Sequence, residues 1–338
     1  MAALGAPSEL GPIALDAIPA AGLRDKLDLQ LRDGVVGLGA LDDPKTLVDM
    51  PTCPLAAPAL DALLAAFRAD RPPVARASVR LRVDMDGARG LWLDLAHADL
   101  KVLLDERAWL ARWAPTCEVE LGPKARRVRL EGGLPGLEPA HLRPWSSTWS
   151  DASPTARELP LLSRVADFSQ PSRRANRALV AAVLAEVAPT GADRWLELGA
   201  GAGNLTLPLA FDRRRVRAVE LEPSALRLNL AAAAQAAVVE VVAGSFARAA
   251  DVAPLVHGVD AILADPPRSG LGPFATALSG LAPSLRPRDL VYVSCHVDAL
   301  AKDTTALAAA GYQPVSVRGV DQFPHTPHVE WVVRFSRG

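Results

Sequence analysis

A cysteine ends the apolar run LVYVSC at residues 290–295. Side chains at the carboxyl ends of parallel strands face the ligand in α/β proteins. A thiolate there can attack an electron-poor carbon, whereas a lone cysteine usually acts as a small buried hydrophobe. A thiol with a pKa of about 8.5 is mostly protonated at neutral pH, so the surroundings of Cys295 decide between the two roles.

A glycine-rich loop and an acidic residue follow two other apolar runs. LELGAGAGN, at residues 196–204, places Gly199, Gly201 and Gly203 directly after a predicted strand, and glycine lets the backbone approach a ligand closely. Glu220 ends the next run, where a carboxylate can accept hydrogen bonds from both ribose hydroxyls. The spacing is not Gly-x-Gly-x-x-Gly and the loop has no Arg or Lys, which favours S-adenosylmethionine over NAD. A strand-to-helix turn with a solvated glutamate is the simpler alternative.

Two prolines follow an aspartate in ADPPRSGL, at residues 264–271. Because proline fixes the backbone, Asp265 is expected to be held at the rim of the sheet, with Arg268 near the same cleft. Asp-Pro-Pro at this position is typical of methyltransferases that act on bases. The alternatives are a rigid turn whose aspartate caps the next helix and, for Arg268, a surface cation rather than a phosphate contact.

The elements that position these residues belong to the second half of the chain. Apolar strands alternate there with helices, which predicts an α/β fold with a parallel sheet and helices on both faces, a Rossmann-like doubly wound domain. The strand segments are expected within 194–204, 216–223, 239–244, 260–267, 290–295, 312–318 and 329–335, and the helices at 173–188, 224–236 and 297–310.

The first half has a mixed α+β pattern. Period-two alternation predicts strands within 77–96, with Asp86-Gly87 as the turn, and again within 117–133. Helices are expected at 58–69 and 98–114, and the Ser-, Thr- and Pro-rich stretch 145–160 is expected to be a linker. The sequence thus predicts a smaller domain at 1–150 and a larger one at 165–338.

Composition narrows the class of protein. The 338 residues include no apolar stretch long enough to span a bilayer, and the first twenty lack the basic region of a secretory signal, so we expect a cytoplasmic protein. Three cysteines are too few for a disulfide framework. With a net charge of −1, contact with nucleic acid requires local basic groups, for which the candidates are Arg173, Arg174 and the run KARRVR at 124–129. Each of these is by default a solvated charge.

Several segments of the second half resemble the RNA uracil-5 methyltransferase family. They are DFSQP (167–171), LELGAGAGN, VELEP, ADPPRSGL, VYVSC and DQFPHTPHVE (321–330), in the order that the family has them. GLRDKLDLQL and PTCPLAAPAL resemble more weakly the segments that precede the catalytic domain. The resemblance implies an S-adenosylmethionine-dependent enzyme that forms 5-methyluridine in tRNA or rRNA, with a catalytic domain at 165–338 and an RNA-facing region in 1–150.

The resemblance also assigns roles to single residues. It makes Cys295 the nucleophile, which adds to C6 of the uracil, and Glu330 the general base. The cofactor site that it implies consists of Gln170, Gly199, Gly201, Asn204, Glu220 and Asp265. Some members hold an iron–sulfur cluster on four cysteines; since Cys53 and Cys117 are the only others here, no such cluster is expected within one chain.

Three departures from the family pattern leave other functions open. His296 stands where the family has asparagine, Gly199 where it often has an aromatic residue, and Ser245 where an acid commonly lies near the adenine. The alternatives are a base N-methyltransferase of the same fold, a non-catalytic RNA-binding relative and an NAD enzyme. A metal site of His325, His328 and Glu330 is disfavoured, because three ligands within six residues at a strand start are awkwardly placed.

Overall fold

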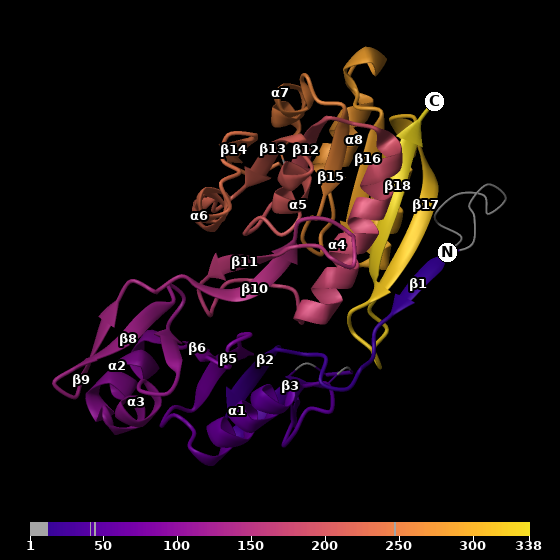
Figure 1. The fold of residues 1–338 in the computed structure, drawn as a ribbon. Coiled ribbons are helices and arrows are strands. Elements are labelled where there is room, and N and C mark those ends of the chain that lie inside the picture. Colours follow the sequence, from indigo (N-terminus) through magenta and orange to yellow (C-terminus); the bar gives the residue numbers. More distant parts are fainter. Residues whose placement is uncertain (1–12, 41, 44, 247) are drawn as a thin grey trace. The chain divides into compact units, whose positions relative to one another are not determined.

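Figure 1 shows the computed structural model of the protein, which describes residues 13–40, 42, 43, 45–246 and 248–338. The chain forms two compact units. The C-terminal unit consists of residues 147–161 and 174–338, with the described residues up to 18; the N-terminal unit consists of 19–146 and 162–173. Residues 1–12, on which the expectation about a secretory signal partly rests, lie outside the described residues.

A single eight-stranded sheet forms the centre of the C-terminal unit. All neighbouring strands are parallel except β18, which is antiparallel to both β16 and β17. The strands, in their order across the sheet, are β1 (Ala14–Ala17), β17 (Tyr312–Asp321), β18 (Glu330–Arg337), β16 (Asp289–Ser294), β15 (Ala261–Ala264), β12 (Arg194–Leu198), β13 (Arg215–Glu220) and β14 (Val239–Ala243).

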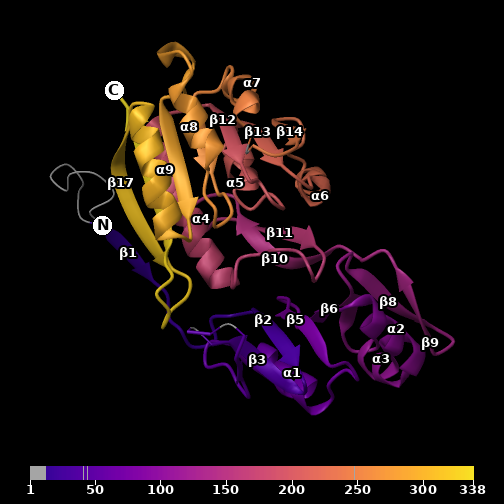
Figure 2. The ribbon, with the colours of Figure 1, turned by 180° about the vertical axis from the view of Figure 1, so that it is seen from behind.

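Helices cover both faces of this sheet, because its central strands are apolar on both sides. In β15, Ala261 and Leu263 belong to one hydrophobic core, whereas Ile262 and Ala264 belong to another. Helix α4 lies over one face and α9 over the other, as Figures 1 and 2 show. The predicted doubly wound α/β fold is confirmed. The helices are α4 (Arg173–Val187), α5 (Thr206–Phe211), α6 (Ser224–Ala232), α7 (Val252–Val256), α8 (Pro273–Ser279) and α9 (Val297–Ala309).

The N-terminal unit has its own eight-stranded sheet and three helices among the described residues. The turn at Asp86-Gly87 joins two antiparallel strands as predicted. In order across the sheet, the strands are β4 (Leu47–Asp49), β3 (Val35–Gly39), β2 (Lys26–Arg32), β5 (Arg76–Val83), β6 (Arg89–Asp94), β7 (Glu118–Leu121), β8 (Arg126–Glu131) and β9 (Leu134–Glu138). The helices are α1 (Pro58–Ala69), α2 (His97–Glu106) and α3 (Ala108–Trp113).

Two local predictions were wrong. The helix expected at 98–114 is two helices, because Arg107 between them has a left-handed φ of 48°. The expected linker at 145–160 contains most of a two-stranded sheet formed by β10 (Arg143–Trp149) and β11 (Glu158–Ser163). Trp149, Leu159 and Leu161 of these strands are buried in a core of the C-terminal unit, and only the turn between the strands is polar and exposed.

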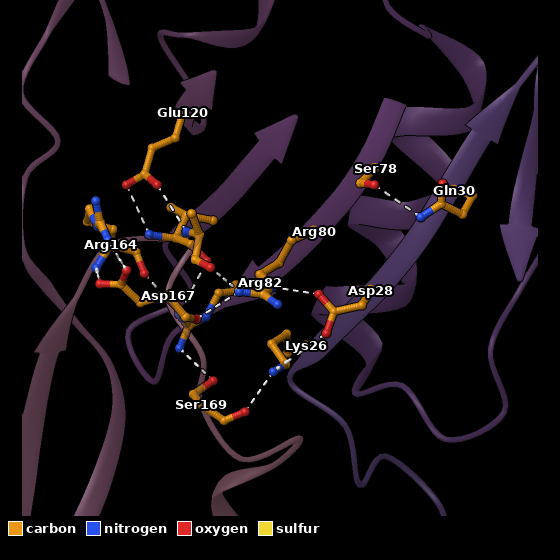
Figure 3. A network of polar contacts seen from close by, with 12 residues as sticks. Lys26, Asp28, Gln30, Ser78, Arg80, Arg82, Glu120, Arg164, Asp167 and Ser169 are labelled. Atoms are coloured by element: carbon orange, nitrogen blue, oxygen red, sulfur yellow. Dashed lines mark hydrogen bonds and ion pairs between the residues drawn. The ribbon is translucent and has the colours of Figure 1, made fainter. Parts of the chain in front are cut away.

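The segment 162–173 belongs to the N-terminal unit, although the larger domain was expected to begin at 165. Buried polar side chains of the N-terminal sheet bind its backbone (Figure 3). Glu120 accepts hydrogen bonds from the amides of Val165 (2.9 Å) and Ala166 (3.0 Å). Arg82 donates to the hydroxyl of Ser169 at 3.0 Å, and Lys26 donates to the carbonyl of the same residue at 2.6 Å.

Candidate active site

Cys295 and Glu330 lie at the same end of two neighbouring strands. The antiparallel register of β16 and β18 ends with Ser294 paired with Trp331, the chain neighbours of Cys295 and Glu330, and the charge of Glu330 acts on the Cys295 thiol. Burial raises the pKa of the Cys295 thiol, the charges of Glu330 and Asp265 raise it further, and Arg268 lowers it. The structure therefore brings together four residues that the sequence singled out.

Glu330 is a buried carboxyl group with only 6% of its surface exposed. Burial raises its pKa to about 8, with a further increase from Asp265 and a decrease from Arg268. In the free protein at neutral pH this group is mostly protonated. Its proton affinity is that of a general base that works near physiological pH.

Asp265 follows β15 directly, and its amide donates to the carbonyl of Leu198 in the neighbouring strand at 3.0 Å. Burial raises the pKa of its carboxyl to about 7. The backbone of Gly199 passes so close that a Cβ atom there would lie 2.6 Å from the carbonyl oxygen of Asp265. With a φ of +80°, position 199 is thus restricted to glycine by contact and by conformation, which explains why this chain has no aromatic residue there.

The glycine loop and Glu220 hold each other in place. The amide of Gly201 donates to one carboxylate oxygen of Glu220 at 2.8 Å, and the amide of Glu222 donates to the other at 3.1 Å. Each oxygen retains a lone pair for a further donor. This arrangement suits the recognition of two adjacent hydroxyl groups.

Asn204 ends the glycine loop and is bound through its side chain to helix α4. Its amide group and that of Asn176 exchange two hydrogen bonds, at 2.7 and 2.8 Å. The hydroxyl of Thr148 donates to the carbonyl of Asn204 at 2.6 Å. These bonds give Asn204 a role in fixing the loop, while its cofactor contact stays a prediction.

Gln170 belongs to the N-terminal unit. It follows Ser169, whose hydroxyl and carbonyl are bound by Arg82 and Lys26. The neighbouring Phe168 has 75% of its surface exposed, and the Lys26 ammonium lies 5.2 Å from the centre of its ring. The predicted cofactor contact of Gln170 stays a prediction.

Glu197 is a buried carboxyl group near the predicted cofactor residues Asp265 and Glu220 that the sequence analysis did not single out. It lies in β12 with 1% of its surface exposed, and burial raises its pKa to about 8, with further increases from Asp265 and Glu220. The sequence feature that could have indicated Glu197 is a charged residue inside an otherwise apolar predicted strand. S-adenosylmethionine has a ribose with two adjacent hydroxyl groups, and the carboxylate of Glu220, held by the amides of Gly201 and Glu222, can accept hydrogen bonds from both. The residues present therefore fit that cofactor.

Other predicted contacts have ordinary structural partners. In the basic run 124–129, Arg127 pairs with Glu118 at 2.7 Å and with Glu138 at 3.0 Å, so much of its charge is balanced. Cys53 and Cys117 are buried, and burial raises the pKa of Cys117 to about 12. Within the described part of the chain, no three or more His, Cys, Asp or Glu residues are grouped so that they could hold a metal ion.

Comparison with known proteins identifies the family. The family model of tRNA (uracil-5-)-methyltransferases matches residues 157–337, more than half of the chain. The chain belongs to this family. An uncharacterized RNA methyltransferase of Bdellovibrio bacteriovorus is 35% identical over 94% of this chain and 82% of its own length. The 23S rRNA (uracil(1939)-C(5))-methyltransferase RlmD of Pectobacterium carotovorum subsp. carotovorum is 33% identical over 86% of this chain, which spans only 61% of that relative.

A solved structure supports the fold over nearly the whole chain. The crystal structure of the Pyrococcus abyssi tRNA (uracil-54, C5)-methyltransferase in complex with S-adenosyl-L-homocysteine matches with a TM-score of 0.65. The match covers 96% of this chain and 78% of that one, at 18% sequence identity. The resemblance drawn from the motifs is confirmed: the protein is an S-adenosylmethionine-dependent RNA methyltransferase of the uracil-5 family. No helix among the described residues is both long and apolar enough to cross a membrane.

Proposed function

We propose that the protein methylates C5 of a uridine in tRNA or rRNA through a covalent bond between Cys295 Sγ and C6 of the base. The observation that carries this proposal is that Cys295 and Glu330 lie next to the last residue pair of β16 and β18, close enough for the charge of Glu330 to act on the thiol. A nucleophile and a carboxylate at one strand end can act on adjacent atoms of one flat ring. The cofactor supplies an electrophilic methyl group and a positive charge.

The chain's residues carry out the remaining steps. The Cys295 thiolate forms a bond to C6, and the electrons of the C5–C6 double bond move into the ring as an enolate, which makes C5 nucleophilic. After C5 has gained the methyl group, Glu330 takes the C5 proton as general base. The C6–S bond then breaks, which restores the double bond and the thiolate.

Both groups must lose a proton before they can act, although burial favours their neutral forms. Arg268 is the positive charge that lowers the pKa of both Cys295 and Glu330. We therefore assign to Arg268 the stabilisation of the reactive thiolate and carboxylate. A cationic cofactor beside the same carboxyl groups acts in the same direction.

The N-terminal unit is assigned to RNA binding, as the resemblance implies for residues 1–150. Phe168 supports this assignment, because an exposed aromatic ring next to a cation suits stacking with an unpaired base. Extracting the target uridine costs a few kcal/mol, which such contacts offset. Gln170 and Asn204 are proposed as cofactor contacts, and the cytoplasmic location stays part of the proposal.

The function is tested by mass spectrometry of the nucleosides in RNA from cells with and without the gene. We expect 5-methyluridine to be lost from one tRNA or rRNA position, and the purified protein with S-adenosylmethionine to restore it. An N-methylated base that is still formed by Cys295→Ala would instead favour the base N-methyltransferase. Calorimetry that detects no S-adenosylmethionine binding would favour the non-catalytic relative.

A further inference from the structure

The loop that carries Arg268 is held at its two ends. It joins β15 to α8, and at its start the amide of Asp265 donates to Leu198 of the sheet. At its far end the amides of Leu271 and Gly272 donate to the two carboxylate oxygens of Asp303, at 2.6 and 3.2 Å. Arg268 lies between these anchors.

Asp303 connects this loop to the segments on either side of Cys295. It lies on α9, the helix that follows Cys295, and it accepts a hydrogen bond at 2.7 Å from the hydroxyl of Tyr292, which lies on the strand that leads to Cys295. Asp303 is 3% exposed and Tyr292 is fully buried. One buried carboxylate thus joins the Arg268 loop to the strand and the helix that set the place of the cysteine.

The loop also packs tightly against this carboxylate. Gly270 has a φ of +81°, and a Cβ atom there would lie 2.4 Å from a carboxylate oxygen of Asp303 and 3.2 Å from the hydroxyl of Tyr292. Arg268 makes no hydrogen bond or ion pair with the residues that the structure describes. The loop backbone, and not a partner of the guanidinium group, therefore determines where its charge lies.

We propose that Asp303, supported by Tyr292, is a positioning residue that fixes Arg268 relative to Cys295 and Glu330. This inference rests on the role given to Arg268 in the proposed function. Three donors meet one buried carboxylate, so its loss leaves them unsatisfied, and the loop moves to find other partners. Asp265 keeps its own bond to Leu198, so the effect concerns Arg268 first.

The test is the rate at which iodoacetamide alkylates Cys295 in the full chain without RNA, followed against pH by mass spectrometry of the peptide. The charges that act on this thiol are those of Glu330, Asp265 and Arg268. We expect Arg268→Ala to slow the reaction at pH 7 by roughly tenfold, because loss of the positive charge raises the pKa of the thiol and leaves less thiolate to react. Asp303→Asn is expected to slow it to a similar extent.

The double variant distinguishes positioning from general damage to the fold. If Asp303 acts through Arg268, combining Asp303→Asn with Arg268→Ala slows alkylation no more than Arg268→Ala alone. Additive effects, or an unchanged rate in a folded Asp303→Asn protein, would overturn the proposal. Because no methyl transfer is measured, the result stands apart from the nucleoside analysis, whose failure would overturn the proposed function alone.

A matched pair of tyrosine variants serves if Asp303→Asn does not fold. Tyr292→Phe removes one of the three hydrogen bonds to Asp303, whereas Tyr312→Phe removes an equally buried hydroxyl that donates to the carbonyl of Pro287 at 2.6 Å. We expect Tyr292→Phe to slow alkylation of Cys295 several-fold and Tyr312→Phe to leave its rate unchanged. Both variants are expected to lower the urea midpoint of unfolding by a similar amount. Equal rates in the two variants would contradict the positioning role.

Discussion

At the scale of single residues, the proposed reactive pair consists of a thiol and a carboxyl group, and burial favours the neutral form of each. Both have raised pKa values, and Arg268 opposes the increase in each. A thiolate stabilised in advance would be open to oxidation and to stray electrophiles. A thiol whose neutral form is favoured by burial is less exposed to both reactions.

Replacing each member of the pair is predicted to stop the reaction at a different stage. Cys295→Ala abolishes methylation while S-adenosylmethionine binding persists, because the nucleophile is lost and the cofactor carboxylates remain. Glu330→Gln lets the adduct form but removes the base, so a covalent protein–RNA complex accumulates on a denaturing gel. Cys117→Ala, at a buried thiol of the N-terminal core, is the control that retains activity. A Glu330→Gln protein that turns over normally would contradict the assignment.

The reaction is predicted to depend on pH through the same two groups. Since Cys295 and Glu330 must both lose protons, kcat/KM for RNA rises from pH 6 through about pH 8, where Glu330 ionises, and continues to rise at higher pH as the Cys295 thiol ionises. Initial rates of methyl transfer at low RNA concentration measure this profile. A rate that falls over the same range would show that the protonated form of one group is the active one.

At the scale of elements, the glycine loop determines how the cofactor acids are arranged. Gly201 and Glu220 are bound to each other, and Gly199 packs against the backbone of Asp265. Each contact joins the ends of neighbouring strands, so the proposed cofactor site lies mainly at the strand ends of one sheet. The loop is therefore sensitive to any side chain that enlarges it.

Gly199→Ala is predicted to lower the affinity for S-adenosylmethionine by roughly tenfold or more, because a Cβ atom there would lie 2.6 Å from the carbonyl oxygen of Asp265 and force the glycine loop to move. Isothermal titration calorimetry measures the change. Gly191→Ala is the matched control, because Gly191 has a φ of +64° but a Cβ atom there meets nothing within 4 Å. Equal affinities in the two variants would show that the close approach to Asp265 is unimportant.

Elements with a strong local pattern were predicted well from the sequence. Helix α1 has the expected bounds, and every expected strand of the C-terminal sheet is present, because apolar periodicity is set by neighbours along the chain. The pairing of β10 with β11 and the attachment of 162–173 to the N-terminal unit were missed. The attachment of 162–173 depends on hydrogen bonds with Lys26, Arg82 and Glu120. These residues are distant from the segment in sequence, so no local pattern predicts the contact.

The candidate site also contains residues that a local pattern reveals and residues that only the folded structure reveals. Cys295, Asp265 and Glu220 could be chosen because each ends an apolar run, where the fold exposes side chains to a ligand. Asp303 and Tyr292 lie inside a helix and a strand, and only the packing of α9 against the loop reveals their common role. Residues that act through such contacts cannot be found from periodicity alone.

At the scale of the whole molecule, both units contain buried carboxyl groups that hold protons near neutral pH. Burial raises the pKa of Glu120 to about 7 in the N-terminal unit, and in the C-terminal unit it raises the pKa values of Asp265, Glu197 and Glu330 to about 7, 8 and 8. The ordinary values in an unfolded chain are about 4. Folding of both units is thus linked to proton uptake.

The free energy of unfolding is therefore predicted to fall as the pH rises from about 5 to 8, because the folded state binds more protons than the unfolded chain throughout this range. Urea unfolding of the free protein at several pH values measures the slope. Glu330→Gln should flatten it, and saturating S-adenosylmethionine should reduce it by lowering the carboxyl pKa values. A stability that increases with pH across this window would contradict the burial of protonated carboxyls.

The central claim is that Cys295 forms a covalent bond to the pyrimidine during methyl transfer. RNA containing 5-fluorouridine tests it most directly, because fluorine at C5 cannot leave as a proton does and the adduct is trapped. With S-adenosylmethionine present, we predict a one-to-one covalent complex whose modified peptide contains Cys295, and no complex with Cys295→Ala. Methylation of ordinary RNA without any trapped complex, or a complex at another residue, would contradict the account.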